Sequence, residues 1–236
     1  MRILFAGGGT AGHINPALAI AGTVREREPD AAILYVGAKG GMEERLVPKA
    51  GFDFKSVTIS GFQRKPSWAN LKKNVKTVVH LFTSTEEAKR IIKEFQPDVC
   101  VGTGGYVSGP VIREAMRLGI PSLIHEQNAF PGVTNKALSK KAAYTMLAVQ
   151  DAKKYLPSTA RCVLTGNPVR PAVIRAEREA SRKKLGLDER PLILSFGGSL
   201  GARRVNEAVA DLLAWSAKEG RFQHIHAYGQ WGRGFP

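Results

Sequence analysis

The first loop of the chain places four glycines, a hydroxyl and an imidazole within seven residues. Its sequence, GGGTAGH, ends at His13 and follows a short apolar run at the N-terminus. The glycines at positions 7, 9 and 12 have the spacing of dinucleotide-binding loops. Glycine lets the backbone approach a ligand, and the helix that follows such a loop offers free N–H groups to an anion. The spacing alone does not separate a redox cofactor from another phosphate or from a simple turn.

His13 stands where the loop meets the following helix, so its side chain can reach a bound ligand. A neutral imidazole suits a general base that deprotonates an alcohol. An isolated histidine otherwise caps or packs, and the neighbouring glycines are what favour a functional role here. His125 and Glu126 end another apolar run; either one orients the other, or both hold a loop through hydrogen bonds. No role is assigned to the remaining histidines, His80, His224 and His226.

Two further glycine loops repeat the first. GTGGYVSGP contains Gly104 and Gly105 and has Ser108 as the expected helix cap, and GGSLGA contains Ser199. Three such loops favour recognition of a phosphate or diphosphate over a purely structural role. The second apolar run ends in YVGAKGG, without the acid that would hold the ribose of NAD, and no Walker G-K-[ST] follows any glycine run. These observations argue against NAD and against a P-loop nucleotide site.

Apolar runs of strand length alternate with helical patterns along most of the chain. RILFAG, AAILYVG, PDVCVGTGG and PSLIHEQN predict strands, and Asn15 with Pro16 predicts the start of the first helix. This β-α-β repetition predicts an α/β fold with a parallel, doubly wound sheet. Ligands of such sheets lie at the carboxyl ends of the strands. That rule selects GGGTAGH, GTGGYVSG, HEQN and TGNPVR as the segments that form a site.

The composition changes after TGNPVRP. A highly charged stretch is followed by PLILSFGGSLGARRVNEAVADLLAWSA, which repeats the order of strand, glycine loop and helix. We therefore expect two domains, a Rossmann-like domain over residues 1–166 and a second Rossmann-like domain over 167–236. Only one strand-helix-strand unit of the second is present, so we expect that domain to be incomplete.

The bulk composition predicts a globular protein with an anionic partner. The chain has 236 residues, a formal net charge of +15 and no apolar run near the ~20 residues that span a bilayer. Nothing at the N-terminus resembles a signal peptide, and we expect a cytoplasmic protein. Cys100 and Cys162 lie in strand-like runs and are expected to be buried free thiols, and no Cys/His spacing predicts zinc. Nucleic acid is disfavoured because no zinc finger, RNP strand or basic heptad is present; part of the charge serves solubility alone.

The segment LKKNVKTVVHLF places apolar and basic residues at helical spacings from Leu71 to Phe82. One interpretation is an amphipathic helix whose apolar face is in the core. The other is a basic and apolar patch that rests on an anionic membrane surface.

Five motifs together resemble one family. GGTAGH, GGYVSGP, HEQN, GNPVR and GGSLGAR occur in the order typical of the MurG family of bacterial UDP-N-acetylglucosamine transferases, and they cover the chain from Met1 to about Val205. The resemblance implies a GT-B fold and an inverting, metal-independent transfer of GlcNAc from UDP-GlcNAc to the MurNAc 4-hydroxyl of undecaprenyl-diphosphate-linked lipid I. The product would be lipid II for peptidoglycan synthesis. The resemblance favours the membrane interpretation of the patch. It also implies a location on the inner face of the plasma membrane and contacts with cell-wall and division proteins.

The resemblance implies that residues 1–166 bind the acceptor and face the membrane, and that residues 167–236 begin the UDP-sugar-binding domain. It also implies a role for individual residues. His13 would be the base that deprotonates the acceptor, with Glu126 in support. The acceptor diphosphate would face Gly8, Gly9, Gly104, Gly105 and Tyr106. The donor would contact Thr10, Ala11, Gly12, Asn128, Arg170 and Ser199. The guanidinium of Arg170 suits a diphosphate because it can bind two oxygens at once.

The end of the chain departs from the family pattern. Family members run further, and GQWGRGFP fits them poorly, as a truncation or a frameshift would explain. We therefore expect acceptor binding but weak or absent transfer. Two alternatives stay open: a non-catalytic lipid-diphosphate-binding fragment or scaffold of cell-wall assembly, and a nucleotide-sugar epimerase. The epimerase is disfavoured by HEQN, by GNPVR and by the absence of a tyrosine-lysine pair.

Overall fold

A computed structural model describes residues 1–59 and 83–232 of the chain. The chain divides into two compact units, Met1–Ile174 and Arg175–Pro236, and each is described by itself. The boundary that the sequence suggested, between residues 166 and 167, lies inside the first unit. The assignment of the two parts to acceptor and donor remains a prediction.

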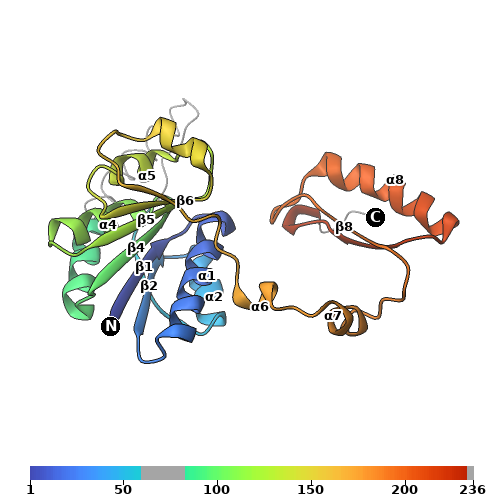
Figure 1. The fold of residues 1–236 in the computed structure, drawn as a ribbon, viewed down its shortest axis with the longest axis horizontal. Helices are drawn as coiled ribbons and strands as arrows, with labels where there is room; N and C mark the ends of the chain where they lie inside the picture. Colours follow the sequence, from blue (N-terminus) through green and yellow to red (C-terminus); the bar gives the residue numbers. More distant parts are fainter. Residues whose placement is uncertain (60–82, 233–236) are drawn as a thin grey trace. The chain divides into compact units, whose positions relative to one another are not determined.

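The first unit is built on a parallel sheet of seven strands (Figure 1). The strand order is β3-β2-β1-β4-β5-β6-β7, so the chain runs outward from β1 to β3 and then returns to β1's other side with β4. This reversal is the topological switch point of a doubly wound sheet, and it confirms the predicted α/β class. The strands are β1 (Arg2–Gly7), β2 (Ala32–Ala38), β3 (Asp53–Val57), β4 (Val99–Gly104), β5 (Ser122–Glu126), β6 (Tyr144–Leu147) and β7 (Cys162–Leu164).

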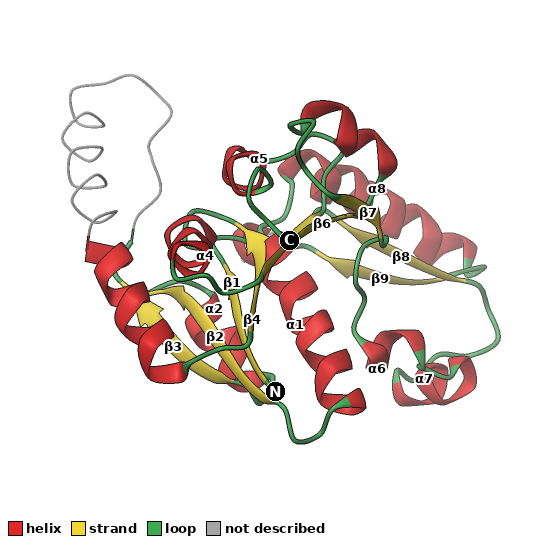
Figure 2. Ribbon diagram, turned by 60° about the vertical axis from the view of Figure 1, so that its left-hand side comes forward, coloured by secondary structure: helices red, strands yellow, loops and turns green. Residues whose placement is uncertain are grey.

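Helices cover both faces of this sheet (Figure 2). Successive residues of β1 point to opposite faces: Ile3 and Phe5 pack with α1 (Ala11–Arg27) and α2 (Glu43–Lys49), whereas Leu4 and Ala6 pack with α4 (Ser108–Arg117) and with helical residues 83–95. Burial of each large aliphatic or aromatic side chain stabilises the fold by about 1.5–3 kcal/mol. The strands are therefore held from both sides, and the loops at their carboxyl ends start from fixed positions. The remaining elements of this unit are α5 (Val133–Leu138), the short 3-10 helix η1 (Gln150–Tyr155) and α6 (Pro171–Ile174).

The first helix begins earlier than the sequence predicted. Thr10, in an extended conformation, occupies the cap position, and the N–H of Ile14 donates to the Thr10 carbonyl at 3.2 Å. The prediction of Asn15 as the cap was therefore wrong. Ile14 is fully buried, and this burial draws the preceding turn into the helix. Pro16 is then inside the helix, where its missing N–H forfeits one bond.

The expected cap of α4 was also misplaced by one residue. Val107 occupies the cap position, and Ser108 is the first helical residue, with its buried hydroxyl oxygen unpartnered. Cys100 is buried in β4, and burial raises the pKa of its thiol to about 12. Cys162 is only partly buried because it lies on the edge strand β7, and both cysteines are free thiols.

The second unit repeats the order of strand, glycine loop and helix. Strands β8 (Leu192–Phe196) and β9 (Gln223–Ala227) pair in parallel and are connected by α8 (Arg203–Glu219). Helix α8 ends at Gly220, whose left-handed conformation is a common helix stop. The short helices α7 (Arg178–Lys184) and η2 (Gln230–Gly232) flank this repeat.

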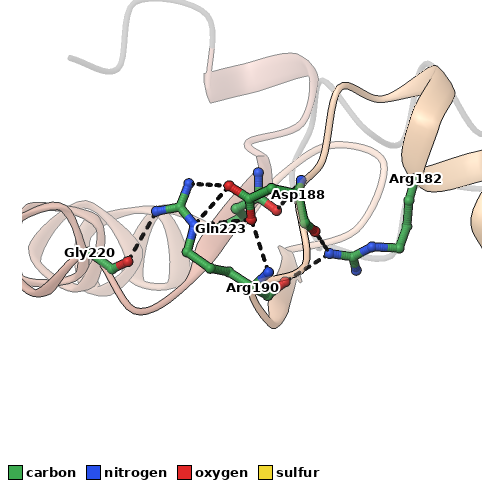
Figure 3. Close-up of polar contacts among 5 residues, drawn as sticks. All are labelled: Arg182, Asp188, Arg190, Gly220 and Gln223. Atoms are coloured by element: carbon green, nitrogen blue, oxygen red, sulfur yellow. Dashed lines mark hydrogen bonds and ion pairs between the residues drawn. The ribbon is translucent and has the colours of Figure 1, made fainter.

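A polar cluster fastens the ends of these elements (Figure 3). The guanidinium of Arg190 binds the carboxylate of Asp188 at 2.7 Å and donates to the Gly220 carbonyl at 3.0 Å. Arg182 donates to the carbonyls of Arg190 and Asp188, and the Asp188 N–H donates to Gln223 at 3.0 Å. The hydrogen bonds from Arg190 hold the pKa of Asp188 below its usual value. Because the ion pair is exposed, its charges contribute little to stability. The hydrogen bonds to backbone groups near the ends of α8 and β8 contribute more.

A second cluster lies between the strands and α8. The hydroxyl of Ser195 is 2.8 Å from His224 Nε2 and 2.9 Å from His226 Nδ1, and His226 Nε2 is 3.1 Å from the side-chain oxygen of Asn206. Burial, and then the neighbouring His226, lower the pKa of His224. The sequence assigned no role to these histidines; in the structure His226 is hydrogen-bonded to Asn206 of α8, and His224 to Ser195 of β8.

The segment Leu71–Phe82, with His80, lies outside the described residues. Among the helices that the structure describes, none has the length and apolar character needed to cross a membrane.

Candidate active site

The four segments selected from the sequence meet at the carboxyl ends of the strands. Strands β1 and β4 are neighbours at the switch point, and β5 lies beside β4. The first two glycine loops are joined directly, because the N–H of Gly8 donates to the Gly104 carbonyl at 3.3 Å. The HEQN segment and Gly166 of TGNPVR are joined to them by side chains. The structure thus brings the four segments together at this edge of the sheet.

The two glycine loops are in backbone contact. A Cβ atom on Gly105 would lie 2.1 Å from the carbonyl oxygen of Gly8, and Gly105 also has a positive φ of 82°. A Cβ atom on Gly104 would lie 2.9 Å from His13 Nδ1. These glycines are therefore required by the contact between the loops and by the position of the imidazole, whatever ligand is bound. Gly12 differs, because a Cβ there would meet only the Thr10 hydroxyl at 3.6 Å.

His13 lies in the first turn of α1, over the end of β4. Its Nδ1 is 3.0 Å from the Thr103 carbonyl oxygen and 3.1 Å from Gln127 Oε1. The Thr103 hydroxyl donates in turn to the His13 carbonyl at 2.7 Å. The ring is thus held on its Nδ1 side and is partly exposed.

Gln127 connects His13 to a buried histidine. Its Nε2 lies 2.9 Å from the Thr103 carbonyl oxygen and 3.0 Å from His125 Nδ1. His125 is fully buried, and its Nε2 is 3.0 Å from the carbonyl oxygen of Gly166. Burial is the main cause that lowers the pKa of His125. Gln127 was missed as a functional candidate although it stands in the HEQN motif, because its partner His13 is 114 residues away in the sequence.

Glu126 holds the loop that follows β5. Its buried carboxylate accepts hydrogen bonds from the N–H groups of Asn128 and Gly132, at 2.9 and 3.0 Å. The side-chain amides of Asn128 and Asn135 donate to it as well, each at 2.9 Å. Of the two alternatives left by the sequence, this geometry fits the one in which Glu126 holds a loop. Its supporting role in catalysis remains a prediction.

Glu43 is a buried carboxylate beneath the first glycine loop. In the sequence it is marked only as an acid at the start of a helix. Its side chain accepts from the N–H of Ala38 at 2.9 Å and from the N–H of Gly9 at 3.3 Å. Burial, and then the charge of Glu43, raise the pKa of Tyr106, whose ring packs over Gly9. Because the N–H groups of Gly8 and Gly9 bind protein atoms, the free donors nearest to His13 are those of Ala11 and Gly12 in the first turn of α1.

The predicted donor residues are divided between the two units. Thr10, at the cap of α1, is exposed and makes no side-chain cap bond. Asn128 is exposed beside Glu126, and Arg170 is exposed where α6 begins. Ser199 is exposed in the loop between β8 and α8. It stands apart from the helix start, because Ala202 is the cap of α8. Among the described residues, no three His, Cys, Asp or Glu side chains are grouped so as to hold a metal ion, and metal independence remains a prediction.

The sequence profile of the N-terminal domain of glycosyltransferase family 28 matches residues 3–147, more than half of the chain. The chain belongs to glycosyltransferase family 28. Its family 28 region contains His13, both N-terminal glycine loops and the HEQN segment, which are the parts that the hydrogen bonds above connect.

Relatives of this family 28 chain carry the name UDP-N-acetylglucosamine–N-acetylmuramyl-(pentapeptide) pyrophosphoryl-undecaprenol N-acetylglucosamine transferase. The protein of Acetivibrio thermocellus is 46% identical over 231 residues, which are 98% of this chain and 62% of that protein. The protein of Clostridioides difficile is 46% identical over 212 residues, 89% of this chain and 51% of that protein. The chain thus spans less than two thirds of the length of these relatives.

Solved structures agree with the fold. MurG of Acinetobacter baumannii is 29% identical with a TM-score of 0.64, over 98% of this chain and 59% of that chain. A UDP-GlcNAc 2-epimerase of Neisseria meningitidis, with UDP-GlcNAc bound, has a TM-score of 0.61 at 13% identity, over 99% and 67% of the two chains. The latter likeness shows a shared fold alone. The GT-B fold class, with a Rossmann-like sheet followed by the start of a second Rossmann-like unit, is confirmed.

The contact between the glycine loops predicts that Gly105→Ala destabilises the chain far more than Gly119→Ala does. Both glycines have a positive φ, 82° and 79°, so alanine costs about 1–2 kcal/mol at either one. Only at Gly105 would the new Cβ collide with a carbonyl oxygen, since Gly119 has nothing within 4 Å. Urea unfolding followed by circular dichroism measures both free energies. Equal losses would contradict the backbone contact.

The buried charge of Glu43 predicts a lower pKa of Tyr106 in Glu43→Gln than in the unchanged chain. The amide keeps the shape of the carboxylate and removes the negative charge that disfavours the tyrosinate. The ring-carbon chemical shift of Tyr106, followed against pH, measures this change. Glu44→Gln is the matched control, because Glu44 is the exposed neighbour on the same helix. A Tyr106 titration that is the same in all three chains would refute the prediction.

Proposed function

We propose that this chain forms the acceptor-binding part, and the beginning of the donor-binding part, of an inverting UDP-GlcNAc transferase. The substrate would be the MurNAc 4-hydroxyl of undecaprenyl-diphosphate-linked lipid I, and the product lipid II. Membership of family 28 and the names of relatives at 46% identity support this proposal.

The observation that carries the proposal is the position of His13. Its imidazole stands in the first turn of α1, beside the joined loops of β1 and β4, with Nδ1 against protein acceptors. A ring fixed on one nitrogen presents the other to a ligand. The free N–H groups and the positive end of α1 lie in the same turn, so this turn can bind a phosphate beside the base.

The chemistry requires one proton transfer and one displacement. His13 takes the proton of the acceptor hydroxyl, whose oxygen forms a bond to the anomeric carbon of GlcNAc from the face opposite the diphosphate. The bond between that carbon and the diphosphate oxygen breaks, and UDP leaves with the electron pair. One displacement inverts the anomeric centre.

We assign the acceptor diphosphate to the surface of Gly8, Gly9, Gly104, Gly105 and Tyr106, and the donor to Thr10, Ala11, Gly12, Asn128, Arg170 and Ser199. Arg170 and Ser199 would meet the leaving diphosphate. We expect this chain to bind the acceptor, and the experiment below tests whether it also transfers GlcNAc. A lipid-linked acceptor also implies a peripheral position on the inner face of the membrane, with contacts to cell-wall and division proteins.

Binding of a soluble diphosphate-linked acceptor analogue tests the proposal. We expect binding by the unchanged chain and about tenfold weaker binding by Tyr106→Ala, which equals about 1.4 kcal/mol. Tyr144→Ala is the control, because Tyr144 begins β6 at the opposite end of the sheet and is 49% exposed. Binding is measured by titration calorimetry.

A folded chain that does not bind the analogue, or an equal loss in both variants, would overturn the acceptor assignment. Addition of UDP-GlcNAc then separates the enzyme from a non-catalytic binding fragment. Transfer of GlcNAc to the analogue would support the enzyme, and binding without transfer would support the non-catalytic fragment.

A further inference from the structure

A series of hydrogen bonds links all four loops at the carboxyl edge of the sheet, from Gly166 through His125 and Gln127 to His13. Its fixed points are backbone carbonyls, which can only accept. These carbonyls therefore determine which atom donates and which accepts in every bond of the series.

The first fixed point is the carbonyl oxygen of Gly166, 3.0 Å from His125 Nε2. Nε2 must carry a hydrogen to make this bond. The ring is fully buried, and burial favours its neutral form. Neutral His125 therefore has a free lone pair on Nδ1.

The second fixed point is the carbonyl oxygen of Thr103. One end of the Gln127 amide faces this oxygen at 2.9 Å and the lone pair of His125 Nδ1 at 3.0 Å. Both are acceptors, so this end must be the NH₂ group, and the reverse orientation would set an oxygen against them. The amide oxygen of Gln127 is then directed to His13, 3.1 Å from Nδ1.

His13 Nδ1 therefore faces two acceptors, the Gln127 amide oxygen and the Thr103 carbonyl oxygen at 3.0 Å. We propose that Gln127 is a positioning residue that, together with the Thr103 carbonyl, holds His13 as the Nδ1–H tautomer and leaves the lone pair on Nε2 for the acceptor hydroxyl. The role of Nε2 as the base rests on the proposed function, whereas the tautomer itself does not.

The two histidines of this hydrogen-bond network are thus expected to have opposite tautomers, Nδ1–H at His13 and Nε2–H at His125. The ¹⁵N shifts of the ring nitrogens in the histidine-labelled chain distinguish these forms without any substrate. Assignment uses the loss of each signal in His13→Gln and His125→Gln. Free imidazole rings of histidine favour Nε2–H, so His13 would depart from the usual form.

Gln127→Met removes the amide and keeps the length of the side chain. We expect the ratio of Nδ1–H to Nε2–H at His13 to fall about two- to tenfold, since one of two acceptors is lost. His125 should keep Nε2–H, because Gly166 is unchanged, and it reports that the fold is intact. Gln150→Met, at an exposed position in η1, is the matched control and should leave both histidines unaltered.

Gln127→Glu provides a second test that does not depend on Gln127→Met folding. A carboxylate in this position would set an oxygen against the Thr103 carbonyl and His125 Nδ1, so we expect His125 to take up a proton on Nδ1 at neutral pH. Nε2–H at His13 in the unchanged chain, or a ratio at His13 that does not alter in Gln127→Met, would overturn the proposal. Failure to bind an acceptor would leave the measured tautomers as they are, so the two proposals fail separately.

Discussion

The site depends on one close contact, the packing of the Gly104–Gly105 backbone against the Gly8 carbonyl. The strands β1 and β4 are neighbours at the switch point of the sheet, so the loops that leave them must share the same space. Side chains at these positions would push the loops apart, since a Cβ on Gly105 would lie 2.1 Å from the Gly8 oxygen. The contact also places Gly104 under the His13 ring. The packing of the two loops and the position of the His13 ring are therefore consequences of one geometric constraint.

Buried carboxylates determine which polar groups remain for a ligand. Glu43 accepts the N–H of Gly9, and Glu126 accepts three hydrogen bonds from the loop after β5 and one from Asn135 of α5. Both negative charges are engaged with N–H donors inside the protein. The groups left towards solvent are the first N–H groups of α1 and one nitrogen of His13. An anionic ligand is therefore expected to accept hydrogen bonds from these groups, because the N–H groups of Gly8 and Gly9 already bind protein atoms.

Much of the fold could be predicted from the sequence because it depends on local patterns. Apolar runs followed by glycine loops give β1, β4 and β8, and the order of these units gives a parallel sheet. The start of α1 could not be read in this way, because burial of Ile14 against the sheet outweighs the cap signal of Asn15. Glu43 and Gln127 were missed because their partners are distant in sequence: Gly9 is 34 residues from Glu43, and His13 is 114 residues from Gln127. The roles of the predicted site residues, and the patch at Leu71–Phe82, remain predictions.

The central claim is that the carboxyl ends of β1, β4 and β5 form the ligand site of this chain. The most direct test is a titration of the ¹⁵N-labelled chain with a soluble diphosphate-linked acceptor analogue, followed by amide chemical shifts. We expect the largest changes at Gly9, Gly105 and Tyr106, on the surface assigned to the acceptor diphosphate, with a change at the His13 ring. Changes confined to residues 175–232, or none at saturating analogue, would contradict the claim.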